Sequence, residues 1–264
     1  MPTAPTLSVQ IRTTRARKDG NKLLSFSLDL EFEAAAGVTI LFGPSGCGKS
    51  TTLAAIAGLT RPDSGRIALG DEVWFDSKRR INVRTENRGV AFVFQSLALF
   101  PHMTAAQNVM YGMAKTHARA EKRERAEAIL GRLKVSHLAE RRPVTFSGGE
   151  AQRVALARAF ATSPRIALFD EPFSAMDRQL RKDLIADVQS FVSDYAIPLI
   201  HVTHQRNEAR ALGNRVILLE RGRIVREGTP AELLPQDVVR DMTFDETPLG
   251  DPLKELSKIA QNGD

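Results

Sequence analysis

The sequence predicts an α/β fold with a mainly parallel sheet, and three observations lead to this class. Short apolar runs such as residues 38–42 and 166–169 have the composition of strands that are buried on both faces. Segments with a helical repeat of apolar residues separate these runs, and strands that alternate with helices form a parallel sheet covered by helices. A charge-rich helical stretch over residues 104–142 interrupts the alternation, so we expect it to form an inserted helical subdomain.

The first third of the chain is predicted to be mostly strand. Apolar and polar residues alternate from residue 7 to residue 42, which is the pattern of strands with one solvated face. Gly58 marks the end of the first predicted helix, since glycine commonly follows the last helical residue. In chain order we expect strands within residues 7–42, a helix over 50–59 and strands within 65–94, of which 90–94 is the strongest.

The second half of the chain returns to alternating helices and strands. Leu180, Leu184 and Val188 repeat at the spacing of one helix face. Arg221 and Gly222 separate two short apolar runs, as expected for a hairpin. In chain order we expect a helix from the glycines at 148–149 to about 162, a strand over 166–169, a helix around 180–188, a strand over 198–203, a hairpin over 216–226 and a short polar tail over 231–264.

Composition narrows the class of protein. The 264 residues are 42% hydrophobic and 26% charged, which suits a soluble globular domain with a core. The sequence contains neither a signal-peptide pattern nor a run of about 18 apolar residues, so we expect no membrane-spanning segment. The net charge of +6 is compatible with nucleic acid, an anionic membrane face or phosphorylated ligands, and equally with solvated helix faces.

A glycine-rich loop predicts a phosphate site. The segment from Gly43 to Ser50 fits G-x-x-x-x-G-K-S and lies between a predicted strand and a predicted helix, the setting that this motif requires. Its glycines let backbone amides turn toward phosphate, and the positive end of the following helix points at the same place. Lys49 can reach the β- and γ-phosphates, and the Ser50 hydroxyl can ligate Mg²⁺. The residues predicted to bind ATP here are Gly43, Pro44, Ser45, Gly46, Cys47, Gly48, Lys49, Ser50 and Thr51.

Cys47 is the one cysteine of the chain, which excludes an internal disulfide and a multi-cysteine zinc site. Because it lies next to a predicted helix N-terminus, we expect its thiolate form to be favoured. ATP should then protect Cys47 from alkylation.

Two carboxylates follow the buried strand at residues 166–169. Asp170 is placed to hold Mg²⁺, and Glu171 is placed to orient or deprotonate the attacking water. An Asp-Glu pair at a strand end is also a common solubilising feature. In combination with the phosphate loop, however, the pair predicts the second half of an ATP-hydrolysing site.

The segment from Phe146 to Arg153 carries a more specific signal. Ser147 and Glu150 have the spacing of a capping box at a helix start, and the two glycines between them leave backbone amides open to an anion. The segment resembles the signature of the ABC ATPase family, usually written LSGGQ, and the resemblance extends over about residues 7–230. It implies a P-loop NTPase core with a mainly parallel sheet, an N-terminal antiparallel β subdomain and a helical subdomain inserted at about 96–160, within an ATPase domain of residues 1–230.

The resemblance also implies roles for individual residues. Two copies would pack head to tail, and the signature of each, Ser147, Gly148, Gly149 and Glu150, would close over the partner's ATP. Gln95 matches the family's Q-loop glutamine, which binds ATP and metal, Asp177 matches the D-loop aspartate, and His204 matches the switch histidine that touches the γ-phosphate. The implied catalytic residues are Glu171, His204 and Lys49, and the implied Mg²⁺ ligands are Ser50, Gln95 and Asp170.

Other features are neutral or depart from the family pattern. Glu150 stands where the broad family has Gln, as in some importer ATPases. The aromatic residue that usually stacks on adenine is missing from residues 12–25, and Phe26 is a weak candidate for it. The remaining histidines have no place in the motif series and are expected to be structural, namely His102, His117, His137 and His201.

Within the family, the chain is most similar to the ATPases of molybdate importers. The resemblance implies a peripheral protein at the cytoplasmic face of the membrane, partnered by a second copy and by a permease, and indirectly by a substrate-binding protein. The apolar segment over residues 96–103 is expected to meet the permease. We expect no extra C-terminal β-domain, which molybdate ATPases often carry.

Three alternatives remain at this point. The substrate could be sulfate, iron or a sugar, since those importers are near relatives. A non-transport ABC ATPase acting on nucleic acid is favoured only by the basic charge, and we expect no nucleic acid partner. A homologue without turnover is disfavoured by the presence of Lys49, Asp170, Glu171 and His204.

Overall fold

The computed structural model describes residues 4–19, 22–113, 118–173 and 178–235. An 11-stranded sheet runs through these residues, in the order β6-β5-β4-β1-β2-β11-β10-β3-β9-β8-β7. The strands are β1 (Leu7–Asp19), β2 (Lys22–Ala34), β3 (Gly37–Phe42), β4 (Ser64–Leu69), β5 (Glu72–Asp76), β6 (Ile81–Asn82), β7 (Val90–Val93), β8 (Ile166–Asp170), β9 (Pro198–Thr203), β10 (Arg215–Glu220) and β11 (Arg223–Gly228). The helices are α1 (Lys49–Ala57), α2 (Ala105–Tyr111), α3 (Arg119–Arg132), α4 (Gly148–Phe160), α5 (Arg178–Tyr195), α6 (Arg206–Leu212) and α7 (Pro230–Leu233).

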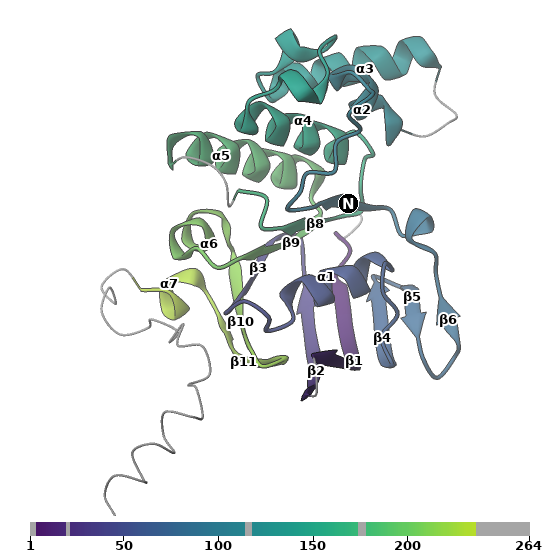
Figure 1. Ribbon diagram of the computed structural model, residues 1–264, viewed down its shortest axis with the longest axis vertical. Helices are drawn as coiled ribbons and strands as arrows, with labels where there is room; N and C mark the ends of the chain where they lie inside the picture. Colours follow the sequence, from purple (N-terminus) through teal and green to yellow (C-terminus); the bar gives the residue numbers. More distant parts are fainter. Residues whose placement is uncertain (1–3, 20–21, 114–117, 174–177, 236–264) are drawn as a thin grey trace, which may run out of the picture.

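Strand direction divides the sheet into two parts. Strands β10, β3, β9, β8 and β7 are parallel neighbours, whereas β6, β5, β4, β1 and β2 pair antiparallel. Helices α2, α3 and α4 lie between β7 and β8 in the chain and form the layer farthest from α1 (Figure 1). The predicted α/β fold with a parallel core, an antiparallel β part and a helical insertion is confirmed.

The sheet separates two apolar cores, one on each face. Successive side chains of a strand point to opposite faces, and β9 follows this rule, since Leu199 belongs to the core that includes α4, α5 and α6 while Ile200 belongs to the core that includes α1. Figure 1 shows the same arrangement, with α1 on one side of the sheet and α4 and α5 on the other. Helix α1 and helix α4 therefore lie on opposite faces.

Several predicted boundaries shift by a few residues. The strand predicted over 90–94 ends at Val93, and the helix predicted over 50–59 covers Lys49–Ala57. Gly58 caps that helix with φ 79°, and its N–H donates to the carbonyls of Ala54 and Ala55. The helical stretch predicted over 104–142 is not continuous: among its described residues α2 ends at Tyr111 with Gly112 as its C-cap, α3 covers Arg119–Arg132, and a 3-10 helix covers Ser136–Leu138. Arg221 and Gly222 both have positive φ, as a tight hairpin turn requires.

No helix among the described residues combines the length and apolar character needed to cross a bilayer. The predicted tail lies almost wholly outside the described residues, as do the D-loop residues 174–177. The limits of the ATPase domain and of its helical insertion stay predictions.

Candidate functional site

The glycine-rich loop joins the end of β3 to the start of α1. Gly48 is the N-cap of α1 with φ 112°, a backbone conformation that side chains disfavour. A Cβ at this position would lie 2.5 Å from Leu28 Cδ1 and 3.0 Å from Phe26 Cζ, so only glycine fits. The amides of the first turn of α1 thus remain available to an anion, beside the positive end of the helix.

Lys49 is held inside this loop. Its side chain is buried, and Nζ donates to the carbonyls of Gly43 at 2.8 Å and Pro44 at 2.9 Å. These bonds fold the loop around the ammonium group and fix the position of a positive charge at the base of the site.

A cavity of about 290 Å³ lies in front of the loop. Its lining brings loop residues together with Glu171 from the end of β8 and with Phe26 from β2, and it comprises Phe26, Ser45, Gly46, Gly48, Lys49, Ser50, Thr51 and Glu171. Phe26, the weak candidate for stacking on adenine, is thus one of the residues that line the cavity.

Ser50 and Asp170 meet at one side of the cavity. The Ser50 hydroxyl donates to Asp170 Oδ1 at 2.9 Å. Burial raises the pKa of Asp170, and neighbouring Glu171 adds to this rise, while the hydrogen bond from Ser50 and the charge of Lys49 oppose it. A partly desolvated carboxylate beside a hydroxyl is a pair of hard oxygen donors, which fits Mg²⁺.

Gln95 lies at the same edge of the sheet as Asp170. It follows β7 by two residues, and β7 pairs in parallel with β8, where Val93 is opposite Phe169. The side chain of Gln95 is exposed. The carboxyl ends of adjacent parallel strands are the usual place for ligands in such sheets, so this position suits a group that would complete a metal site.

Glu171 and His204 form a contact across two neighbouring strand ends. His204 Nδ1 lies 3.1 Å from Glu171 Oε2, with 54% and 19% of the respective side chains exposed. Glu171 has φ 47°, a left-handed conformation that costs a non-glycine residue about 1 kcal/mol and tends to occur at functional sites. The Glu171 N–H donates to the Val202 carbonyl at 3.1 Å, which fastens this turn to β9.

Cys47 corrects one sequence-based expectation. Its side chain is 3% exposed and does not line the cavity. Burial raises the pKa of the Cys47 thiol, and the opposing charge of Lys49, whose Nζ is 4.0 Å from Sγ, is the smaller effect. The expected thiolate character was wrong because desolvation outweighs the favourable position near a helix N-terminus.

The signature segment forms the predicted capping box at the start of α4. Ser147 Oγ accepts from the Glu150 N–H at 3.3 Å, and Glu150 Oε2 accepts from the Ser147 N–H at 2.7 Å and from its hydroxyl at 2.9 Å. Glu150 Oε1 lies 3.0 Å from Nε2 of His137. The hydrogen bond with His137, followed by those with Ser147, lowers the pKa of Glu150 to about 2.

The two signature glycines have different surroundings. A Cβ on Gly148 would meet nothing within 4 Å, whereas one on Gly149 would lie 2.1 Å from Leu180 Cδ2. Gly149 lets α4 approach α5, and Gly148 leaves the helix start open. None of the residues that line the phosphate cavity comes from α4, so the chain's own signature does not close its own loop. Asp177, the predicted D-loop residue, is outside the described residues.

The segment that follows Gln95 is only partly a free surface. Leu97 and Ala98 both have left-handed φ, and Arg158 of α4 donates to their two carbonyls at 2.8 and 2.7 Å. Leu99 packs against the core and Phe100 is half-buried, so the predicted apolar patch is in part internal packing. No local pattern points to Arg158, because its role depends on contacts with residues 60 and 61 positions away.

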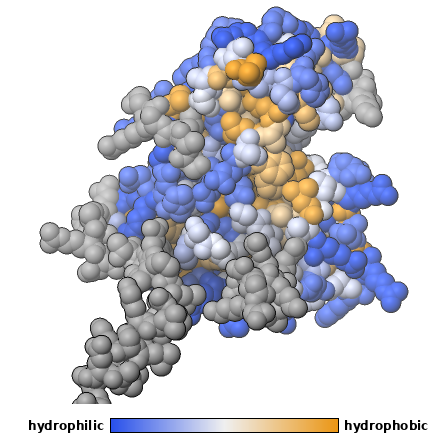
Figure 2. Space-filling model, viewed as in Figure 1, coloured by the Kyte–Doolittle hydropathy of each residue, from blue (hydrophilic) through white to orange (hydrophobic). Residues whose placement is uncertain are grey.

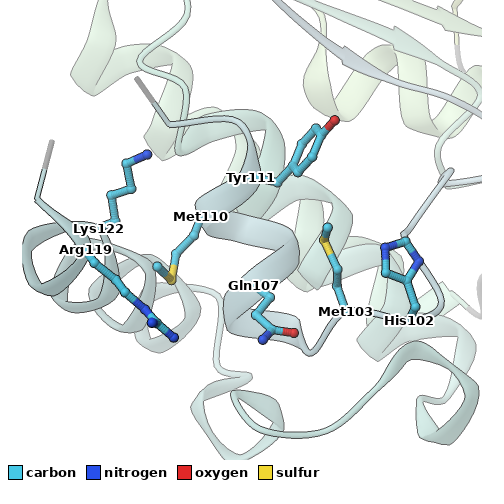
Figure 3. Close-up of a pocket in the computed structure, with 7 residues that line it drawn as sticks. All are labelled: His102, Met103, Gln107, Met110, Tyr111, Arg119 and Lys122. Carbon is cyan, nitrogen blue, oxygen red and sulfur yellow. The ribbon is translucent and has the colours of Figure 1, made fainter. Parts of the chain in front are cut away.

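A second cavity, of about 590 Å³, opens beside this segment (Figure 3). Its walls come from the end of the loop, from α2 and from α3, and comprise His102, Met103, Gln107, Met110, Tyr111, Arg119 and Lys122. Tyr111 is 63% exposed. Figure 2, in the view of Figure 1, shows apolar residues gathered in a band between the helical layer and the sheet.

Known proteins resemble this chain in both sequence and structure. Residues 27–174 match the family model described as ABC transporter. A molybdenum import ATP-binding protein of Rhodospirillum rubrum is 39% identical over 214 residues, which are 81% of this chain and 58% of that protein. A sulfate/thiosulfate import ATP-binding protein of Agrobacterium fabrum is 42% identical over 213 residues, which are 80% of this chain and 60% of that protein.

The solved structure of a dimeric bacterial ABC transporter cassette matches with a TM-score of 0.72 and 29% identity, covering 85% of this chain and 98% of the cassette. The same cassette in a post-hydrolysis state, bound to ADP and phosphate, matches equally well. The chain spans about 58% of the length of the molybdenum import proteins it resembles.

Proposed function

Because this chain belongs to the ABC transporter family, we propose that it binds and hydrolyses ATP as the motor subunit of a membrane importer. The observation that carries the proposal is the convergence of the phosphate loop, the Ser50–Asp170 pair and the Glu171–His204 pair on one edge of the sheet. Each group comes from the end of a parallel strand, or from the loop or helix that follows one.

In the proposed site the loop amides and Lys49 bind the β- and γ-phosphates. Ser50, Asp170 and Gln95 hold Mg²⁺, which when bound neutralises phosphate charge. Glu171 orients and deprotonates the attacking water, and His204 contacts the γ-phosphate and supports Glu171. Catalysis in this arrangement is mostly positioning and electrostatic stabilisation.

Two copies of the chain assemble head to tail in this proposal. The position of the signature away from its own phosphate cavity supports it, as do the open surroundings of Gly148. The matching solved cassette is dimeric. Ser147, Gly148, Gly149 and Glu150 of one copy then face the ATP of the other, with Asp177 at the same interface.

The proposed substrate is molybdate. Several molybdenum import proteins are 36–39% identical to this chain, and the sulfate/thiosulfate import protein at 42% keeps sulfate as the principal alternative. A permease is the proposed membrane partner, with the cavity between α2 and α3 as its docking place, and a substrate-binding protein delivers the ion. The chain would then lie at the cytoplasmic face of the membrane, with residues 1–230 as the ATPase domain.

The activity is tested with the purified protein, MgATP and a phosphate-release assay. We expect turnover that Lys49→Ala abolishes, and we expect Glu171→Gln to bind MgATP, lose hydrolysis and elute as a dimer only with ATP. Hydrolysis by Glu171→Gln at the wild-type rate would overturn the assignment of the base.

The substrate is tested in cells that lack the gene and grow on scarce molybdate. Loss of cellular molybdenum that the wild-type gene restores and Lys49→Ala does not would support molybdate. Unchanged molybdenum with reduced sulfate uptake would move the assignment to sulfate. DNA-stimulated, salt-sensitive ATPase activity would instead favour the nucleic acid alternative.

A further inference from the structure

A buried contact between a histidine and a glutamate joins the strand before His204 to the helix after it. His201 of β9 is 0% exposed and Glu208 of α6 is 3% exposed, and Nε2 of the histidine meets Oε1 of the glutamate. The contact is a hydrogen bond between the imidazole ring and the carboxyl group. His204 lies on the short turn between the two partners.

The same histidine also touches both sides of the Glu171 turn. Its ring packs on Phe169 at a centroid distance of 6.1 Å and on Phe173 at 5.5 Å, and both phenylalanines are fully buried. These residues stand just before and just after Asp170 and Glu171 in the chain. His201 is therefore in contact with the supports of both members of the Glu171–His204 pair.

Stability alone is a poor explanation for this pair. Burying two ionisable groups costs solvation energy, and apolar residues of similar volume often serve a core as well or better. His201 Nδ1 has no hydrogen-bond partner among the described residues, which adds to the cost. What the pair supplies, and an apolar contact does not, is a directional link between β9 and α6.

We propose that His201 and Glu208 are positioning residues that hold His204 and Glu171 in contact. The inference rests on the proposed ATPase function. With the link intact, α6 is fixed against β9, so the His204 turn stays beside Glu171, whose own turn is fastened to Val202 and backed by Phe173. The phosphate loop leads from β3 into α1, and α1 packs on the other face of the sheet, so we expect the link to affect MgATP binding little.

The test uses the full chain with both residues replaced by apolar ones, His201→Phe together with Glu208→Leu. We expect an unchanged or higher melting temperature and an unchanged Kd for MgATP. We expect kcat to fall by about 10- to 100-fold with KM unchanged, because a small displacement of catalytic groups has costs of this size. Leu199→Met, a volume-conserving change on the same face of β9, is the matched control and keeps kcat.

Two further variants separate positioning from packing. Glu208→Gln keeps a hydrogen-bonding partner for His201 Nε2 and should keep kcat within about threefold of wild type, since the link is directional rather than electrostatic. In a His204→Ala background the apolar double substitution should lower kcat by less than about twofold further. The effects of residues that act through one contact are not additive.

Full kcat in the apolar double variant, or a full multiplicative loss in the His204→Ala background, would overturn the inference. A wild-type protein that fails to hydrolyse ATP would overturn the proposed function instead, so the two failures are distinguishable. A double variant that loses MgATP binding together with kcat would also contradict a positioning role.

Discussion

His204 Nδ1 lies 3.1 Å from Glu171 Oε2, although the two residues are 33 positions apart in the chain and directly follow two neighbouring strands, β9 and β8. The contact places a titratable ring against the carboxylate that is proposed to act on water. His204→Ala should therefore lower kcat by about 100-fold while MgATP binding changes little. Steady-state phosphate release and nucleotide titration check this, with Asn207→Ala as a control at an exposed residue of α6, the helix that follows the His204 turn. Equal losses in binding and kcat would contradict it.

His137 is the main cause of the low pKa of Glu150, which is about 2. Replacing it in His137→Ala should raise the pKa of Glu150 toward the usual value of a glutamate, although the Ser147 bonds keep it below that value. Carboxyl-carbon NMR titration measures the change directly. A pKa that remains at about 2 in the variant would show that Ser147 alone sets it.

The same pKa has a consequence for stability. A carboxylate with a depressed folded-state pKa stabilises the native state above its unfolded value of about 4.3, and the effect disappears as pH falls through the folded value. At pH 7 the wild-type protein should have a higher melting temperature than the Glu150→Gln variant. The two melting temperatures should converge as pH falls from about 4.5 to 2. A difference that stays constant over this range would exclude the charge of Glu150 as its source.

Cys47 should react slowly with alkylating agents in the folded protein, because burial both shields the thiol and raises its pKa. Iodoacetamide labelling should be fast in urea and slow in buffer, with little effect of MgATP in buffer. Mass spectrometry of the intact chain gives both rates. Rapid labelling of the native protein that MgATP blocks would restore the reactive-thiolate interpretation.

Arg158 should be important for the loop after Gln95, since its guanidinium donates to the carbonyls of two left-handed residues. Arg158→Lys loses this forked geometry and should lower the free energy of unfolding by about 2 kcal/mol. Urea unfolding measures the change, and Arg84→Ala, at a residue whose side chain is 82% exposed, is a control that should be close to neutral. Equal stability of the two variants would contradict the role given to Arg158.

The fold and the phosphate loop were predictable because their signals are local. Gly48, Lys49 and Ser50 are adjacent in the chain, and a buried strand followed by Asp170 and Glu171 is visible as a short pattern. The boundaries of α2 and α3 were less accurate, since helical periodicity continues across Gly112 while the helix does not.

Contacts between distant segments were not predictable in the same way. The environment of Cys47 depends on burial, which a helix N-terminus read from sequence does not reveal. The sequence indicates only a structural role for His201, because nothing near it in the chain shows that Phe169 and Phe173 pack on its ring, and no local pattern points to Glu208. The contact between His137 and Glu150 likewise depends on how the chain folds between α3 and α4, which no local pattern shows.

The sheet places the phosphate loop of α1 and the signature of α4 on opposite faces, so in a head-to-tail pair each shared site takes its two halves from different chains. Consider a mixed dimer of one chain with Lys49 replaced and one chain with Ser147 replaced. Both substitutions would then fall in the same one of the two sites. The other site would be assembled from intact halves alone. Two alleles that are each inactive would then complement one another.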